Sequence, residues 1–309
     1  IYLCLAGGVA LNCVANGKIL KQKIFDNIWV QPAAGDAGGS LGAALALWHI
    51  EKDNPRKVNH NDNMQGSYLG PEYSQKEIEE QLDKAGAKYE IFEDQKLLDK
   101  TATDLSKEDA VGWFQGRMEF GPRALGGRSI LGDPRSEKMQ KNLNLKVKYR
   151  ESFRPFAPSI LKDDLSEWFD INIDSPYMLM VSNIKEDKII EMTDKQKKLF
   201  GIDKLNVKRS EIPAVTHVDY SARIQTVHKE TNEKYFRLIE KFKDKTNCPI
   251  LINTSFNVRG EPIVNTPLDA FNCFMGTDLD KLVIGNCYLD KNNQNPLLKK
   301  DYTKEFELD

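Results

Sequence analysis

The sequence has no apolar run that approaches the ~20 residues needed to cross a membrane, although 40% of its residues are hydrophobic. The apolar stretch at the start follows no basic segment and contains Gly7 and Gly8, which is not typical of a signal peptide. The chain also has no internal repeat and no low-complexity region. These absences predict a globular protein without a membrane partner.

Cysteine and histidine are scarce. No two cysteines have the C-x-x-C spacing of a zinc site, and no two histidines are four residues apart. We therefore expect reduced thiols, a cytoplasmic protein and no zinc centre. The residues concerned are Cys4, Cys13, Cys248, Cys273 and Cys287, together with His49, His60, His217 and His228.

Basic residues concentrate in one part of the chain. Ten basic and four acidic side chains lie between Arg117 and Arg154, a net charge of +6 in a chain whose net charge is −2. Six of the ten are arginines, whose planar guanidinium fits phosphate or carboxylate with two hydrogen bonds. Such an excess in a slightly acidic protein indicates an anionic partner.

The spacing favours a small anion over a polymer. Glycines and prolines interrupt the arginines, and glycine lets backbone N–H groups approach a phosphate closely. Two other interpretations stay open. On composition alone, an ordinary solvated basic loop explains the stretch equally well. RNA binding is the other alternative, because RNA-binding proteins also present basic concave surfaces. Nucleic acid is disfavoured because the chain is acidic overall and the stretch has few aromatic residues for base stacking.

Hydrophobic patterning predicts an α/β (α+β) protein. Residues 1–5 and 28–30 read as strands, each followed by a glycine-rich turn and a helix, over 9–22 and 41–50. Further on, Ser74 and Glu77 form a capping box for a helix that ends near Gly86. Later helices are expected over 97–105, 136–143, 232–243 and 267–275, and later strands over 110–114, 177–181, 249–253 and 282–284.

Four separated motifs occur in order. They are Phe120-Gly-Pro-Arg123-Ala-Leu-Gly, Lys148-x-Arg150 with Ala157-Pro158-Ser159, Thr216-His217-Val-Asp219 with Ala222-Arg223-Ile-Gln225, and Asn253-Thr-Ser255-Phe-Asn257 with Gly260-Glu261-Pro262. The second and fourth resemble the nucleotide-binding signature of YrdC-like domains. Together they resemble the O-carbamoyltransferases that include nodulation protein U and the cephamycin and aminoglycoside carbamoyltransferases, over nearly the whole chain.

The resemblance implies a domain layout. Residues 1–55 would be the end of an actin-like ATPase-type domain, 56–66 a linker, and 67–309 a YrdC-like domain with a twisted sheet. The chain begins at Ile1 inside an expected strand, and we expect it to be the C-terminal fragment of a longer protein. No function is predicted for residues 183–211, which read as a charged surface excursion with a short helix.

The resemblance also implies a reaction. The YrdC-like domain would make carbamoyl-adenylate from ATP, held with Mg²⁺, and carbamoyl phosphate. The actin-like domain would then transfer the carbamoyl group to a hydroxyl of a sugar or natural product. The alternative is a nucleotide-binding module that is inactive without the rest of the protein. The acceptor is not predicted, and a homodimer is one of the oligomeric states left open.

Candidate residues follow from charge and position in the motifs. Lys148 and Arg150 are candidates for the triphosphate, and Arg123, Arg154 and Arg223 for carbamoyl phosphate or the adenylate. Ser255, Asn253 and Asn257 would bond phosphate oxygens or the carbamoyl amide, and the resemblance places Met178 near the carbamoyl group. Ser255 is not expected to be a nucleophile because no Gly-x-Ser-x-Gly elbow surrounds it.

Several residues keep a structural alternative. His217 is equally compatible with acid–base work, phosphate binding and a structural role. Arg117, Arg128 and Arg135 are favoured as pairing or scaffolding residues, and Glu261 is explained as well by fixing a turn.

In the first segment the resemblance implies nucleotide contacts at Gly7, Gly8, Asn12, Gly35 and Gly38. It makes Asp36 a ligand to iron in the full-length protein, beside two histidines that this chain does not contain. Because one carboxylate cannot complete such a site, we expect no iron here. Asp36 is also plausible as a helix N-cap.

Overall fold

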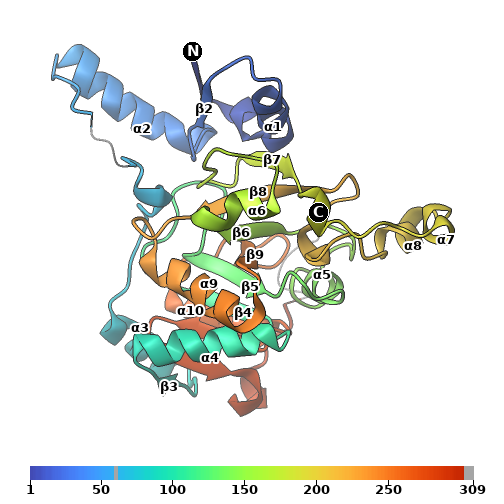
Figure 1. Cartoon of the computed structure of the whole chain (residues 1–309). Helices are drawn as coiled ribbons and strands as arrows, with labels where there is room; N and C mark the ends of the chain where they lie inside the picture. Colours follow the sequence, from blue (N-terminus) through green and yellow to red (C-terminus); the bar gives the residue numbers. More distant parts are fainter. Residues whose placement is uncertain (59–61, 303–309) are drawn as a thin grey trace.

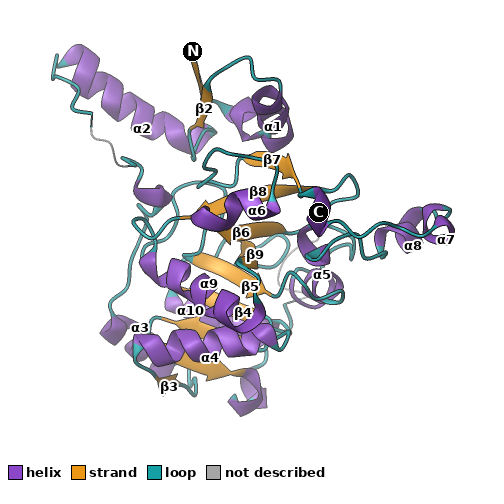
Figure 2. Ribbon diagram, in the orientation of Figure 1, coloured by secondary structure: helices purple, strands orange, loops and turns teal. Residues whose placement is uncertain are grey.

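The computed structural model describes residues 1–58 and 62–302, so the predicted surface residue His60 lies outside the described part. It is a mixed α/β protein with a small sheet at the start and a large mixed sheet that occupies most of the chain (Figures 1 and 2). The α/β (α+β) prediction is confirmed, whereas the proposed domain boundaries at 55 and 66 stay a prediction.

The first segment contains a parallel pair of strands, β1 (Tyr2–Leu5) and β2 (Asn27–Val30). Between them, the helix predicted over 9–22 is interrupted: a 3₁₀ turn ends at Leu11, and Asn12 caps α1 (Cys13–Lys21) by accepting a hydrogen bond from the Ala15 amide. The prediction missed this break because helical periodicity continues across an N-cap. Helix α2 (Asp36–Ala46) begins five residues earlier than expected, after Gly35, and continues as a π-helical turn to Glu51.

Nine strands form the large sheet, in the order β3-β11-β10-β4-β5-β9-β6-β8-β7. Most neighbouring pairs are antiparallel, and only β10–β4 and β6–β8 run parallel. The strands are β3 (Glu90–Ile91), β4 (Val111–Phe114), β5 (Arg128–Gly132), β6 (Ala157–Leu161), β7 (Met180–Asn183), β8 (Ser221–Val227), β9 (Ile250–Ser255), β10 (Lys281–Ile284) and β11 (Cys287–Asp290).

Strands β5, β8 and β11 were not identified from the sequence. Strand β5 begins with Arg128 directly after two glycines, a composition typical of a loop. It is nevertheless central in the sheet and completely buried, because Arg128 directs its guanidinium to backbone carbonyls instead of to solvent. The tertiary structure therefore overrides the local composition.

Helices cover the large sheet. Helix α4 packs against α9, and α3 against α10. The predicted capping box is confirmed at the start of α3, since the Ser74 side chain accepts from the Glu77 amide and the Glu77 side chain accepts from the Ser74 amide. The helices are α3 (Gln75–Lys84), α4 (Asp94–Ser106), α5 (Met139–Asn142), α6 (Leu165–Trp168), α7 (Asp194–Lys197), α8 (Gly201–Leu205), α9 (Glu233–Thr246) and α10 (Pro267–Gly276).

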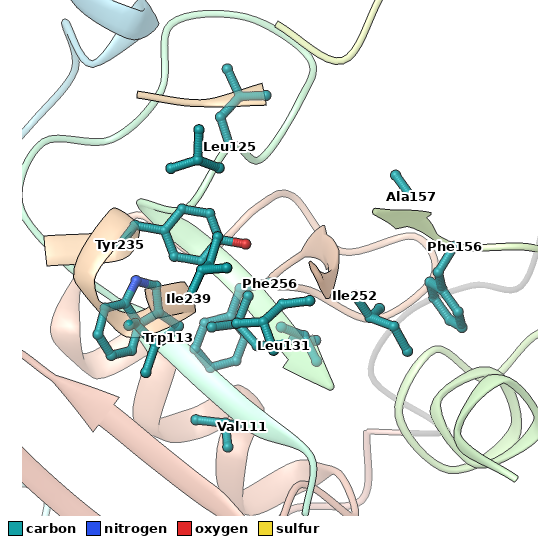
Figure 3. Packing of buried hydrophobic residues seen from close by; sticks show 14 of the residues in the cluster. Val111, Trp113, Leu125, Leu131, Phe156, Ala157, Tyr235, Ile239, Ile252 and Phe256 are labelled. Carbon is teal, nitrogen blue, oxygen red and sulfur yellow. The ribbon is translucent and has the colours of Figure 1, made fainter. Parts of the chain in front are cut away.

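The core lies between α9 and the centre of the sheet. Tyr235 and Ile239 point from α9 toward Trp113 and Phe256 in Figure 3, and all four side chains are fully buried. Trp113 also donates through Nε1 to the Gly126 carbonyl at 2.9 Å. Gly126 has φ +109° and packs directly on the Tyr235 ring, where a side chain would not fit. The core thus fixes the loop between β4 and β5, which carries Arg123.

The first segment is joined to the large sheet at its β7 edge. Asn16 is buried on α1 and donates through Nδ2 to the carbonyls of Ala10 (2.8 Å) and Leu179 (3.0 Å). Next to it, a Cβ on Gly17 would lie 2.1 Å from the Val181 carbonyl oxygen. Glycine is therefore required for α1 to approach the strand this closely.

Residues 184–211, hereafter the arm, extend away from the sheet and carry α7 and α8 (Figure 1). The expected surface excursion is confirmed, although it holds two short helices instead of one. All five cysteines are free thiols. Among the described residues, no helix has both the length and the apolar character that crossing a membrane requires.

The Gly17 contact predicts opposite effects for two Gly→Ala substitutions. Gly17→Ala should lower the free energy of unfolding by about 1–3 kcal/mol, because the new methyl group overlaps the Val181 carbonyl. Gly39→Ala on α2, where no atom lies within 4 Å, should raise it by about 0.5–1 kcal/mol through helix propensity. Denaturant unfolding followed by circular dichroism measures both, and equal effects would contradict the close approach of α1.

Candidate functional site: an arginine-lined cavity

A cavity of about 300 Å³ opens where the motifs of the large domain meet. It is hereafter called the arginine cavity. Three loops and the ends of β6, β8 and β9 surround it. Its lining consists of Pro122, Arg123, Ala124, Arg150, Arg154, Pro155, Phe156, Ala157, Met178, Arg223, Asn253, Thr254 and Ser255. Seven of the ten predicted catalytic and anion-binding residues of this domain are among them.

Four arginines and no carboxylate line the arginine cavity. Among the described residues, only Arg154 of these four has an acidic partner, Glu151, with 2.8 Å between Nε and the carboxylate. The Nε groups of Arg123 and Arg223 are buried and have no hydrogen-bond partner in the part of the chain that the structure describes. A buried donor without a partner is costly, so this arrangement is suited to receive an anion.

The guanidinium groups are close enough to affect one another. Burial and, as the second cause, the neighbouring charge of Arg123 lower the pKa of Arg223 to about 10. Burial and the charge of Arg154 likewise bring the pKa of Arg150 to about 10. Arg150 and Arg223 therefore remain cationic at neutral pH, and a bound phosphate would offset both the cost of burial and the repulsion.

Asn144 orients Arg150. Its Oδ1 accepts from the Arg150 Nε at 2.6 Å, and its Nδ2 donates to the carbonyls of Ser152 and Arg154. The Arg150 guanidinium also lies 5.0 Å from the centroid of the Phe156 ring. Sequence reasoning missed Asn144, because its complete burial is visible only in the structure.

Lys148 lies behind the cavity wall and is not part of its lining. Its buried ammonium donates to the carbonyl and hydroxyl of Ser255, and to the carbonyl and Oδ1 of Asn257, both at 2.8 Å. Ser255 Oγ in turn donates to Asn257 Oδ1 at 2.6 Å, and Asn257 Nδ2 to the Glu261 carbonyl. Of the three predicted residues, only Ser255 faces the cavity, while Lys148 and Asn257 hold it in place.

Asn253 and Met178 form the inner wall. Asn253 is buried and donates to the Ala124 carbonyl (3.2 Å) and to Gln225 Oε1 (2.8 Å), which leaves its own Oδ1 without a partner. Met178 is buried with φ +57°, a left-handed conformation that is uncommon for a residue other than glycine. Such conformations cost free energy and concentrate at binding sites.

Two residues that sequence reasoning did not select shape the loop around Arg123. Buried Glu119 accepts through Oε1 from the amides of Leu125 (2.6 Å) and Gly127 (2.7 Å). Gln225 donates to the Leu125 carbonyl at 2.7 Å. Arg128 lies underneath, where it donates to four carbonyls of neighbouring loops and stacks 3.5 Å above the Phe114 ring.

The arginines that were favoured as scaffolding residues lie outside the arginine cavity. Arg135 pairs with Asp133 at 2.6 Å, and Arg117 pairs with Glu72 at 3.5 Å. His217 is also outside the lining. Burial lowers its pKa, and Arg223 and Arg209 add to this effect.

None of the residues predicted to contact nucleotide in the first segment lines the arginine cavity. Asn12 caps α1, Gly35 precedes α2, and a Cβ on Gly38 would meet the Ala33 carbonyl at 2.1 Å. Gly7 has φ +93°, and both Gly7 and Gly8 are exposed in the turn after β1. The segment reaches the cavity through Cys13, whose thiol lies beside the Arg223 guanidinium.

Asp36 is the first residue of α2 and is exposed, so its side chain is not the N-cap. Within residues 1–58 and 62–302, no three His, Cys, Asp or Glu side chains gather in a way that could hold a metal ion. The described residues therefore do not fit an iron centre, and an iron ligand role for Asp36 in a longer protein stays a prediction.

The buried Lys148 predicts a pH dependence of stability. Burial, reinforced by Arg150, lowers its pKa from 10.5 to about 7. Between pH 7 and 10.5, Lys148 is protonated in the unfolded chain and largely deprotonated in the folded chain. The free energy of unfolding should therefore rise with pH, by up to about 1.4 kcal/mol per pH unit. The unfolding free energy of wild type minus that of Lys148→Met should thus increase between pH 7 and 9. A flat difference would mean that the four oxygen acceptors keep Lys148 protonated.

Comparisons with known proteins identify relatives of this chain. The family model described as "Carbamoyltransferase C-terminus" matches residues 102–291, and the one described as "Carbamoyltransferase N-terminus" matches residues 2–45. The chain is 56% identical to the uncharacterized protein sll1178 of Synechocystis sp. over 99% of its own length and 50% of that protein. It is 41% identical to nodulation protein NolNO of Sinorhizobium fredii, over 95% of this chain and 40% of that protein.

Nodulation protein NolO of Bradyrhizobium diazoefficiens is 42% identical over 92% of this chain and 48% of that protein. The chain thus spans about half the length, or less, of these relatives. Among solved structures, full-length HypF in its phosphate- and nucleotide-bound form aligns with 64% of the chain at a TM-score of 0.40 and 14% identity, which is too distant to support an argument.

The C-terminal model matches more than half of the chain and contains every residue of the arginine cavity. The chain therefore belongs to the carbamoyltransferase family.

Proposed function

We propose that this chain makes carbamoyl-adenylate in the arginine cavity, as the C-terminal part of an ATP-dependent O-carbamoyltransferase. One observation carries the proposal: within residues 1–58 and 62–302, four arginines, two of them with an unpartnered Nε, surround a cavity that no carboxylate lines. ATP and carbamoyl phosphate together bring at least five negative charges. Chemistry between them requires that their repulsion be offset, and phosphoryl chemistry depends mainly on positioning and electrostatics.

The proposed reaction has two steps in this cavity. Water hydrolyses carbamoyl phosphate to carbamate and phosphate. A carbamate oxygen then attacks the α-phosphorus of ATP, the bond to the β-phosphate oxygen breaks, and pyrophosphate leaves. In a third step, outside this cavity, a hydroxyl of the acceptor attacks the carbamoyl carbon and AMP leaves. We propose a small-molecule hydroxyl as acceptor, without assigning it further.

Roles follow from where each side chain lies. Arg123 and Arg223 are assigned to the phosphate of carbamoyl phosphate and then to the adenylate, because their buried Nε groups have no hydrogen-bond partner among the described residues. Arg150 and Arg154 are assigned to the triphosphate. Ser255 Oγ and Asn253 Oδ1 can bond the carbamoyl amide, and Lys148 fixes their strand end. Mg²⁺ enters as part of the MgATP substrate, since no carboxylate lines the cavity to bind it.

RNA binding is the less favoured alternative. Only one aromatic residue, Phe156, lines the cavity, whereas single-stranded nucleic acid is usually held by several stacking rings. The alternative would gain support from RNA affinity that falls steeply with salt concentration.

Pyrophosphate release tests the proposed function. The 309-residue chain is incubated with MgATP, with and without carbamoyl phosphate. Release should require carbamoyl phosphate and fall about 10²-fold in Arg223→Met, because one donor to the reacting phosphate is lost. Arg117→Met is the matched control, since Arg117 lies outside the cavity and pairs with Glu72; its rate should be unchanged.

The assay separates the remaining interpretations. ATP binding without pyrophosphate would mean that the chain is a nucleotide-binding module that needs the rest of a longer protein. Absence of ATP binding would contradict the assignment of the arginine cavity altogether.

A further inference from the structure

The arm and Val218 together form a second cavity, of about 310 Å³, which is separate from the arginine cavity. Its volume is at the lower end of the ~300–1,000 Å³ range of small-molecule sites. Most of its lining is apolar, and two cations complete it. The lining residues are Met192, Leu199, Phe200, Gly201, Lys204, Leu205, Arg209 and Val218.

Arg209 is the unusual member of this lining. Its side chain is only 6% exposed, yet no carboxylate of residues 1–58 or 62–302 forms an ion pair with it. One terminal nitrogen donates to the carbonyls of Lys204 (3.0 Å) and Leu205 (3.1 Å), while Nε is buried without a partner. Arginine is rarely buried unless it is paired, because an uncompensated charge in an apolar setting is costly.

We propose that this cavity binds a monocarboxylate with an apolar chain of medium length, such as octanoate. The carboxylate would pair with the Arg209 guanidinium, which offers the planar donor geometry that carboxylates prefer. The chain would lie against Met192, Leu199 and Leu205, where removal of its methylene groups from water is favourable. A strongly hydrated polyanion such as a triphosphate would lose more than it gains in this apolar lining.

The cavity has a second cation and an exposed mouth. Lys204 lines it, and its ammonium is held by the Lys197 carbonyl at 3.1 Å. Phe200 and Val218 are 93% and 60% exposed, so a ligand can enter without rearrangement of the sheet. Both residues are apolar surface that a bound chain would cover.

The neighbourhood of Arg209 offers a local readout. Burial lowers the pKa of His217, and the charges of Arg223 and Arg209 act in the same direction. A carboxylate on Arg209 would offset that charge, so the pKa of His217 should rise when the ligand binds. The imidazole signal followed by NMR reports this change, and adsorption elsewhere on the surface would not produce it.

Calorimetric titration with octanoate tests the proposal, with 1-octanol as the uncharged comparison. Wild type should bind octanoate at least about tenfold more tightly than 1-octanol, because only octanoate pairs with Arg209. Arg209→Met should weaken octanoate binding about tenfold or more. Lys195→Met removes a charge from the same arm outside the cavity lining, and its affinity should equal that of wild type.

Arg209 donates hydrogen bonds to the last carbonyls of α8, so Arg209→Met could weaken binding simply by disturbing this helix. A second variant keeps the proposal testable in that case. Val218→Trp changes an exposed residue at the mouth, keeps every charge, and should reduce octanoate affinity by filling the space. No octanoate binding by wild type would overturn the proposal. So would equal binding of octanoate and 1-octanol, or unchanged affinity in both cavity variants. None of these results bears on carbamoyl-adenylate formation, so the two proposals fail independently.

Discussion

Repulsion among four guanidinium groups is the constraint on which the rest of this structure depends. Arg123, Arg150, Arg154 and Arg223 come from three separate segments and converge on one cavity, where a single surface carboxylate offsets one of them. Like charges in a partly buried site do not stay together unless the surrounding fold holds them there. Much of the neighbouring structure consists of side chains whose hydrogen bonds hold these arginines and their loops in place.

These residues are buried; two are neutral amides, and two are charged side chains that bond the backbone of the surrounding loops. Asn144 fixes Arg150 and two carbonyls of the adjoining loop, and Gln225 joins the loop at Leu125 to Asn253. Glu119 accepts hydrogen bonds from backbone amides of the same loop, and Arg128 donates hydrogen bonds to backbone carbonyls of this loop and of neighbouring loops. Side chains of this kind orient the binding residues without competing for the ligand, which is what a preorganised site requires.

The first segment contributes to the same site from outside the large sheet. Helix α1 packs on β7 at Gly17, and Asn16 holds the Leu179 carbonyl, next to the strained Met178 in the cavity wall. Cys13 lies beside Arg223 on the same helix. The segment that the N-terminal family model matches is thus in direct contact with the wall of the arginine cavity. A carbamoyl group that is made in the cavity and used elsewhere would have to pass such a boundary.

The sequence by itself determined the fold class, the boundaries of the strongly patterned helices and seven residues that line the cavity, because these depend on local signals such as capping residues, apolar periodicity and motif order. It also determined the excess of positive charge between Arg117 and Arg154. Tertiary structure alone decided which of these charges act together. Arg128 and Arg135 have the same side chain as Arg123 but are turned toward carbonyls and Asp133, respectively. It also placed Lys148 behind the wall and left Arg209 buried without an acidic partner among the described residues. The physical reason is that the ion-pair or hydrogen-bond partner of a side chain, and the lining of a cavity, come from segments that are distant in sequence. No local sequence pattern encodes the contact between such segments.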